Sequence, residues 1–204
     1  MRPRPNETLA ASVTNPVALR ARPSPDAKVI ARVAKRTRFH TPSVMAVVRQ
    51  RGRWLGVTSE HLSNGELGWV RQDKVKLLRE QWRIDVDLSD RRAVLKRLGR
   101  PRASFAVAVG AAATPTPPGR YGVTDRLSTG GAGSPYGCCV LALSGHQPNV
   151  PQDWPGGDRL AIHGTSAPAS IGQAASNGCL RAGERSMRLL IARVPLGTQV
   201  VVRP

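Results

Sequence analysis

The sequence predicts a mainly β fold built from short strands, with one or two short helices. Short alternating or apolar runs between Gly, Pro and Asn residues are typical of barrels and sandwiches. Those runs are Val44–Val48, Trp54–Val57, Trp69–Val70, Trp82–Asp87, Phe105–Val109, Arg159–Ile162 and Gln199–Val202. Helical periodicity is confined to Ser89–Leu98, where apolar residues recur behind a Ser cap, and to Glu184–Ile191.

The chain of 204 residues, 40% of them hydrophobic, can hold one ordinary domain or two small ones. Its formal charge of +18 is spread over both halves: 16 basic minus 5 acidic residues give +11 through Arg79, and 15 minus 8 give +7 after it. Such a charge attracts polyanions, including nucleic acid and an anionic cell wall. No segment interleaves Lys or Arg with stacking aromatics, so we expect no nucleic-acid partner.

No run of eighteen apolar residues is present, so we expect no transmembrane segment. Residues 1–15 lack the apolar core of a signal peptide, and no export signal is visible. Three cysteines are an odd number, which argues against a disulfide framework and leaves at least one thiol free. Cys138 and Cys139 are expected to point to opposite faces of a strand. The Cys and His spacings fit no zinc site, so we expect no metal.

The first part of the chain shows a characteristic order of strand and turn signals. A segment with a Pro turn, Ala18–Pro25, precedes Val29–Val33, then Arg53–Val57 with its Trp, and then Gly65–Val70 with a second Trp. This order resembles bacterial SH3-like domains over residues 12–78. The resemblance implies a small barrel, whose two Trp residues we interpret as core because so small a barrel buries limited area. A second domain is predicted over residues 81–204.

The second part contains a candidate nucleophile, Cys179, and a candidate base, His163. A thiol becomes a good nucleophile when a neighbouring base or cation favours the thiolate. Gly178, directly before the Cys, allows close approach of the backbone to a substrate. A Cys and a His alone are a weak signal, and without further context a small buried side chain is the favoured interpretation of the Cys.

Wider context favours a catalytic interpretation. The segments Ile162–Thr165 and Ser176–Arg181, joined through Ile171–Ser176, resemble the signature of the L,D-transpeptidase (YkuD-type) family. Thr114–Tyr121 resembles the "TPxG" stretch of that family, and Val194–Val201 resembles its closing strand. The resemblance implies a β-sandwich catalytic domain that forms 3-3 cross-links in peptidoglycan through a cysteine acyl-enzyme, with release of D-alanine. It also implies an exported enzyme, periplasmic or cell-wall associated, acting on stem peptides without a cofactor and inhibited by carbapenems.

The resemblance further implies roles for individual residues. Cys179 attacks the carbonyl between the third and fourth stem residues, and His163 takes and returns the proton. The Gly164 carbonyl holds the imidazole, and the N–H groups of Gly178 and Cys179 form an oxyanion hole.

Four further residues are candidates for substrate binding: Ser176, Asn177, Arg181 and Tyr136. Three of them have an alternative role: Ser176 could close a turn, and Tyr136 could simply pack. Arg181 could form a surface ion pair, for example with Glu184, three residues further along the chain. Asn177 departs from the family, which more often has His there. Asn cannot change its charge near neutral pH, so His163 is expected to be the base of a dyad.

We expect a monomer. Two alternatives to the transpeptidase function remain. In an L,D-carboxypeptidase, water replaces the acceptor amine. In a wall-binding module, the Cys site has decayed and the chain only binds the anionic cell wall.

Overall fold

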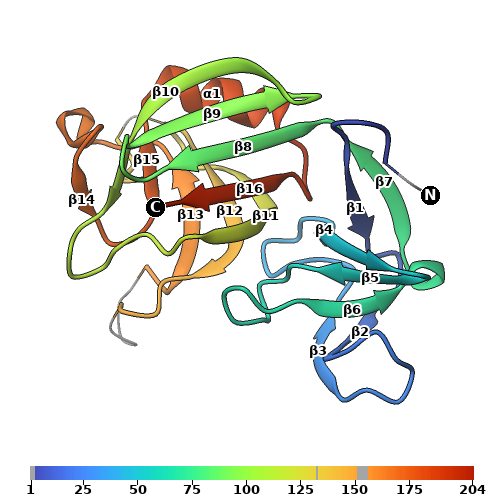
Figure 1. Cartoon of the computed structure of the whole chain (residues 1–204). Coiled ribbons are helices and arrows are strands. Elements are labelled where there is room, and N and C mark those ends of the chain that lie inside the picture. The colour runs from blue at the N-terminus through green and yellow to red at the C-terminus, as the bar shows by residue number, and fades with distance from the viewer. Residues whose placement is uncertain (1–2, 132, 151–155) are drawn as a thin grey trace.

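The computed structural model describes residues 3–131, 133–150 and 156–204, and it contains two β-sheets that follow one another along the chain (Figure 1). The first sheet is formed by strands up to Glu80, and the second begins at Trp82. The predicted mainly β fold is therefore confirmed.

The first sheet has seven strands in the order β3-β2-β6-β5-β4-β1-β7. Their bounds are β1 Thr8–Ser12, β2 Val17–Arg20, β3 Val29–Val33, β4 Val44–Arg51, β5 Trp54–Val57, β6 Gly68–Arg71 and β7 Lys76–Glu80. A short 3-10 helix, Gln72–Lys74, leads into β7. Leu19, Leu55 and Val57 are fully buried at the centre of its core. Its assignment as an SH3-like domain stays a prediction.

The second sheet has nine strands in the order β14-β10-β15-β13-β12-β11-β16-β8-β9. Their bounds are β8 Trp82–Asp87, β9 Arg92–Arg97, β10 Arg100–Gly110, β11 Gly119–Ser128, β12 Cys139–His146, β13 Arg159–His163, β14 Ala174–Ser176, β15 Leu180–Ala182 and β16 Gln199–Arg203. Because β9 also pairs with β10, the sheet closes on itself around one apolar core.

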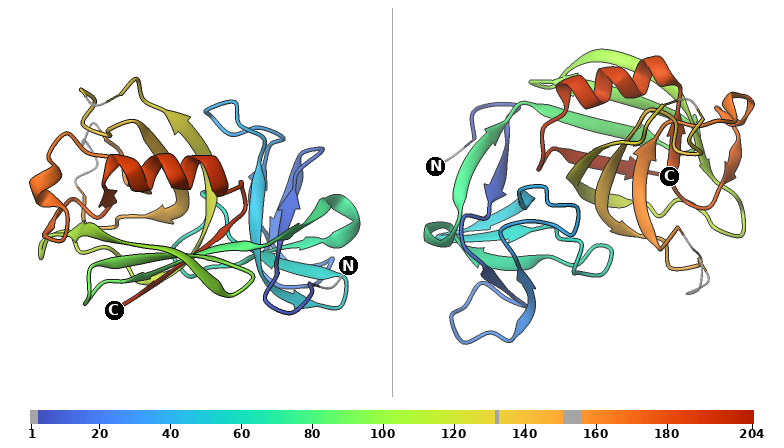
Figure 2. Two further views of the ribbon diagram at one scale, coloured as in Figure 1. Left: turned by 90° about the horizontal axis from the view of Figure 1, so that it is seen from above. Right: turned by 180° about the vertical axis from the view of Figure 1, so that it is seen from behind.

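The helix predicted near the C-terminus is present as α1, Glu184–Arg193, which lies against the strands of the second sheet (Figure 2). Its buried residues, Met187 and Leu190, belong to the core of that sheet. A 3-10 helix, Pro168–Ser170, lies in the loop before β14.

The helix predicted over Ser89–Leu98 is wrong, because this segment forms the turn and second strand of the β8–β9 hairpin. Ala93 and Leu95 alternate with more exposed neighbours and point into the core, as strand residues do. Lys96 lies 2.6 Å from Asp85 across the hairpin, and this ion pair adds to the strand pairing. Tertiary pairing therefore overrides the helical spacing of the apolar residues.

The two sheets contact each other closely through β4 and β11. A Cβ on Gly122 would lie 2.9 Å from the Cβ of Ala46, and one on Gly197 would lie 2.6 Å from the Cβ of Ala10. These glycines therefore permit an approach that any side chain would prevent. The side-chain amide of Gln199 also donates to a backbone carbonyl of β4 at 2.8 Å.

Polar groups extend the contact between the sheets. The Asn64 side-chain amide donates to the His146 carbonyl at 2.6 Å, and its oxygen accepts the His146 N–H at 2.9 Å. The ring of His146 lies between the Glu60 carbonyl, at 2.9 Å, and the Asp158 carboxylate, at 3.0 Å. Over the described ranges of the chain, no helix has the length and apolarity needed to cross a membrane.

Candidate active site

Cys179 lies in a tight turn that joins β14 to β15. Gly178 adopts a φ of +107°, a conformation that residues with a Cβ rarely adopt. The Ser176 hydroxyl donates to the Cys179 carbonyl at 2.5 Å and accepts the Gly178 N–H at 3.2 Å. Ser176 is buried and closes the turn, which is one of its two predicted roles.

A second layer of side chains supports this turn. The buried Thr116 hydroxyl donates to the Gly178 carbonyl at 2.8 Å and accepts the Gly110 N–H at 2.8 Å. Gln147, also buried, donates to the Thr114 carbonyl at 3.1 Å and so holds the neighbouring loop. The segment Thr114–Tyr121 resembles a stretch of the family, but the sequence assigned no role to Thr116. No sequence motif pointed to Gln147.

His163 ends β13 and is buried, with its Nδ1 2.5 Å from the Gly164 carbonyl. A carbonyl only accepts hydrogen bonds, so Nδ1 carries the proton and Nε2 is an acceptor. Burial lowers the pKa of His163 to about 4, with the positive charge of Arg181 acting in the same direction and the Gly164 hydrogen bond opposing. The imidazole is therefore neutral near pH 7. Tyr136 packs edge-on against the ring, with 5.0 Å between the ring centroids.

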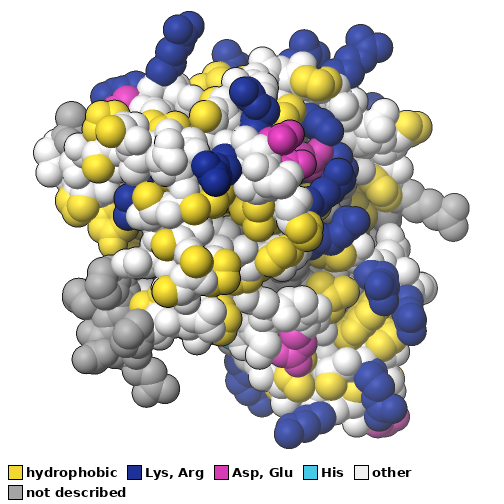
Figure 3. All heavy atoms as spheres, turned by 60° about the vertical axis from the view of Figure 1, so that its left-hand side comes forward, with side chains coloured by type: hydrophobic (Ala, Val, Ile, Leu, Met, Phe, Trp, Pro, Cys, Tyr) yellow, Lys and Arg dark blue, Asp and Glu magenta, His cyan; other side chains and the backbone are white. Residues whose placement is uncertain are grey.

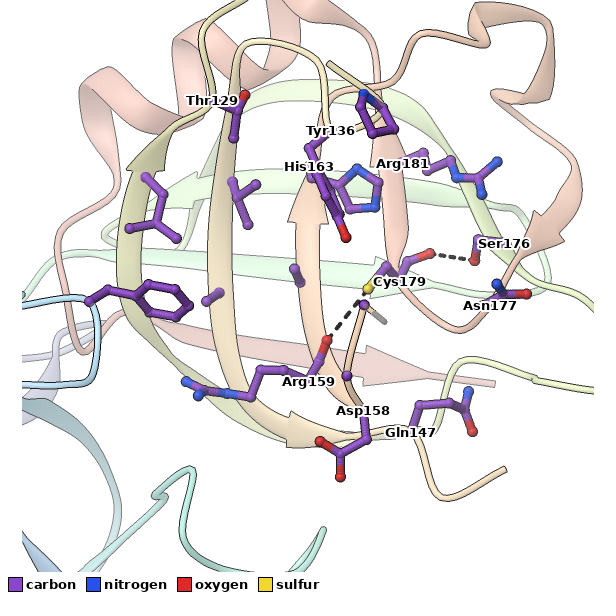
Figure 4. A pocket seen from close by; sticks show the side chains of 18 of the residues that line it. Thr129, Tyr136, Gln147, Asp158, Arg159, His163, Ser176, Asn177, Cys179 and Arg181 are labelled. Atoms are coloured by element: carbon purple, nitrogen blue, oxygen red, sulfur yellow. Dashed lines mark hydrogen bonds between the residues drawn. The ribbon is translucent and has the colours of Figure 1, made fainter. Parts of the chain in front are cut away.

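The Cys179 thiol donates to the Arg159 carbonyl at 3.6 Å (Figure 4). Burial raises the pKa of this thiol, while a backbone hydrogen bond from Ala161 and the charge of Arg181 partly offset the effect. The resting site thus combines a protonated thiol with a neutral imidazole. Such a pair reacts by general-base catalysis, in which the proton leaves sulfur as the new bond forms.

Cys179 and His163 line the same cavity, of about 610 Å³. Figure 4 shows both side chains among the residues that line it. The residues that line it come from both sheets: Arg38, Phe39, Leu127, Thr129, Pro135, Tyr136, Val140, Ala142, Gln147, Gly156, Gly157, Asp158, Arg159, Ala161, His163, Ser176, Asn177, Cys179 and Arg181. A cavity of this size is typical of sites that bind small molecules or peptide segments.

The remaining predicted substrate residues, Asn177, Arg181 and Tyr136, all line this cavity. Glu184, the alternative partner of Arg181, instead accepts the Cys138 N–H at 2.9 Å and lies 3.9 Å from Arg188. Arg181 thus lines the cavity, and among the described residues no ion pair joins it to Glu184.

The two adjacent cysteines differ from expectation, because Cys138 and Cys139 are joined by a disulfide and both belong to the core of the second sheet. Strand alternation does not separate them, since Cys138 precedes the first residue of β12. Cys179 is the free cysteine of the described chain.

Fold and site together define a mainly β protein with a cysteine–histidine site in an open cavity. The model of the YkuD family, the L,D-transpeptidase catalytic domain, matches residues 81–202, which is more than half of the chain. The chain belongs to this family.

Among curated proteins, YkuD of Bacillus licheniformis is 34% identical over 123 residues, and YkuD of Bacillus subtilis is 31% identical over 121 residues. The matched segments cover 60% and 59% of this chain and 66% and 65% of those relatives, so the match spans just under two thirds of their length.

Solved structures show the same fold at low identity. An L,D-transpeptidase mutant of Enterococcus faecium superimposes with a TM-score of 0.50 at 17% identity, covering 78% of this chain and 74% of that one. L,D-transpeptidase 3 of Mycobacterium tuberculosis, in complex with a faropenem-derived adduct, gives 0.50 at 14% identity, covering 68% and 73%.

Proposed function

We propose that this protein is an exported peptidoglycan L,D-transpeptidase that forms 3-3 cross-links through an acyl-enzyme on Cys179. The observation that carries the proposal is the shared cavity of Cys179 and His163, in which the Gly164 carbonyl leaves Nε2 as the free acceptor. The family relationship supports the chemistry.

In the first half-reaction, Nε2 of His163 takes the thiol proton while Sγ of Cys179 bonds to the carbonyl carbon between the third and fourth stem residues. The resulting oxyanion is stabilised by the Cys179 N–H, a donor worth about 3 kcal/mol in comparable sites. The Gly178 N–H already bonds to Ser176, so Cys179 contributes the freer donor of this turn. The C–N bond then breaks, and the imidazolium returns its proton to the departing D-alanine amine.

In the second half-reaction, the side-chain amine of another stem attacks the thioester. His163 takes a proton from this amine and gives it back to the departing thiolate, which restores the thiol. Arg181 binds a stem carboxylate, for which the guanidinium fork provides two donors. Asn177, exposed at the cavity, can donate a hydrogen bond to the stem but cannot exchange a proton.

The basic surface supports a location at the anionic wall. Lys and Arg side chains are scattered over both parts of the molecule on the face shown in Figure 3, in keeping with the charge of +18. Such a charge increases the local concentration of the protein near a polyanion.

Incubation with a disaccharide-tetrapeptide tests the proposal, with products identified by mass spectrometry. A cross-linked dimer together with free D-alanine is the expected result. Tripeptide without dimer would instead establish the carboxypeptidase. Binding to isolated cell walls that survives Cys179→Ala, with neither product formed, would establish the wall-binding module.

The low pKa of His163 predicts an unusual pH dependence for acylation of Cys179 by a carbapenem. A base must be unprotonated, and His163 is so at every pH above its pKa of about 4. The rate should therefore stay flat from about pH 7 down to about pH 5 and fall below that. Stopped-flow acylation rates check this, with circular dichroism at each pH to confirm folding. An inflection near the ordinary histidine pKa would contradict the prediction.

Gly178→Ala is expected to slow the same acylation about 100-fold or more, because the added Cβ is strained at φ +107° and collides with the side-chain amide of Gln147. Gly172→Ala is the matched control, since Gly172 also has a positive φ, +82°, but open space around it. That variant should acylate at nearly the wild-type rate. Equal rates for Gly178→Ala and wild type would show that the turn does not position the thiol.

A further inference from the structure

The loop from Arg36 to Pro42, between β3 and β4, belongs to the first sheet, yet it reaches the cavity of Cys179. Arg38 and Phe39, at its tip, line the same cavity as Cys179 and His163. The site is thus built from both sheets, although the family match begins only at residue 81.

Backbone contacts hold this loop in one conformation. Arg36 and Pro42 form an isolated β-bridge, and the Thr37 N–H donates to the Thr41 carbonyl at 2.9 Å. Within the loop, the His40 N–H donates to the Thr37 carbonyl at 3.0 Å, and the Arg36 guanidinium donates to the His40 carbonyl at 2.6 Å. A loop closed in this way loses little further entropy when it binds a ligand.

Side chains anchor the loop to the catalytic sheet. The hydroxyls of Thr37 and Thr41 donate to the same carboxylate oxygen of Asp125, at 2.5 and 2.6 Å, and Asp125 is fully buried. The other Asp125 oxygen lies 3.5 Å from the guanidinium of Arg159, which also pairs with Glu60 of the first sheet. The Arg159 carbonyl in turn accepts the Cys179 thiol. One chain of contacts therefore runs from the loop to the nucleophile.

The tip offers a cation beside an apolar ring. Phe39 is 40% exposed, although it is a large hydrophobic residue, and the Arg38 guanidinium carbon lies 4.7 Å above its ring. Burial lowers the pKa of Arg159 to about 10, and the positive charge of Arg38 contributes to the effect. Arg159 has two carboxylate partners, whereas within residues 3–131, 133–150 and 156–204 Arg38 has none. An unpaired guanidinium facing a cavity suits a ligand carboxylate.

We propose that the Arg36–Pro42 loop is a substrate-binding element of this enzyme, in which Arg38 pairs with a carboxylate of the stem peptide and Phe39 packs against its aliphatic part. The proposal rests on the proposed function, because it names the ligand of that same cavity. It makes the first sheet a specificity-determining part of the site and not only a neighbour.

Binding of a synthetic tetrapeptide stem to the Cys179→Ala protein tests this without requiring turnover. Calorimetry would compare Cys179→Ala alone with the same protein carrying Arg38→Ala, Phe39→Ala or Arg32→Ala. Arg32 is the matched control, since it is an exposed Arg of β3 outside the cavity. The expected Kd increase is about three- to tenfold for Arg38→Ala and for Phe39→Ala, and none for Arg32→Ala. Stems with their carboxylates amidated one at a time identify the paired group.

If Arg38 pairs with a particular stem carboxylate, the stem amidated at that carboxylate should bind with the same Kd to Cys179→Ala with and without Arg38→Ala. Equal Kd values for the free stem in all variants would overturn the proposal, as would the absence of any stem binding to Cys179→Ala. Tight, Arg38-dependent binding combined with no turnover by the wild type would leave the subsite standing and remove the transpeptidase assignment. The binding measurements thus test the Arg38 subsite, and the turnover measurements test the transpeptidase assignment.

Discussion

Cys179→Ala is expected to eliminate covalent labelling by a carbapenem and to reduce peptidoglycan turnover by at least about 10⁴-fold. No other free cysteine is present in the described chain, and the remaining two are joined as a disulfide. Alanine leaves His163 and its Gly164 hydrogen bond in place but removes the atom that becomes acylated. Intact-protein mass spectrometry should show one adduct on the wild type and none on the variant.

The control for this result is the fold of the variant, measured by near-ultraviolet circular dichroism. Cys179→Ser adds a second comparison, because it keeps the shape of the side chain and replaces a thiol by a much weaker nucleophile. An adduct that persists in Cys179→Ala would mean that another side chain is acylated. A wild-type protein that stays unmodified, although iodoacetamide alkylates Cys179, would contradict an acyl-accepting site, and Asn177 would be the first residue to substitute with His.

Asp125→Ala is expected to lower the free energy of unfolding by about 3–5 kcal/mol. Asp125 is fully buried, accepts hydrogen bonds from Thr37 and Thr41 of the first sheet, and faces the buried guanidinium of Arg159. Removing the Asp125 carboxylate leaves the hydroxyls of Thr37 and Thr41 with one hydrogen-bond partner fewer. It also leaves the buried Arg159 guanidinium with Glu60 as its remaining carboxylate partner. Urea unfolding followed by fluorescence measures the loss.

Asp90→Ala is the matched control, because Asp90 is exposed in the β8–β9 turn and its change should shift stability by no more than about 0.5 kcal/mol. If Asp125→Ala unfolds at the wild-type midpoint, the hydrogen bonds and ion pair of Asp125 between the sheets contribute nothing to stability. A biphasic transition in the variant would show that the two sheets had become independent.

The sequence predicted the strands well wherever they were short, apolar and bounded by turns. Trp54–Val57 and Trp82–Asp87 coincide with β5 and β8. It misjudged Ser89–Leu98, where Leu98 occurs at helical spacing but lies at φ +50° in the next turn, 38% exposed. Local spacing alone cannot show that this segment pairs with β8 and β10, since those contacts are set by the closed sheet.

The candidate site was visible where its residues are close in sequence or belong to a motif. Cys179, Gly178 and Ser176 form one turn, so their relation follows from the local chain. The position of Arg38 at the cavity could not be predicted, because it depends on how one sheet is oriented on the other. Asp125 likewise reads as an ordinary strand residue until its partners from the first sheet are known.

The close contact between the two sheets has a consequence for the proposed reaction. Only Gln81 separates β7 from β8, so no flexible tether connects the two parts. In tethered modules, linker length sets the effective concentration of one site at the other. Here, the close contacts at Gly122 and Gly197 fix that relation instead. If the protein acts as proposed, a strand of the polymer held by the first sheet would reach Cys179 in an orientation set by these contacts, so the arrangement of neighbouring strands would become part of what is selected.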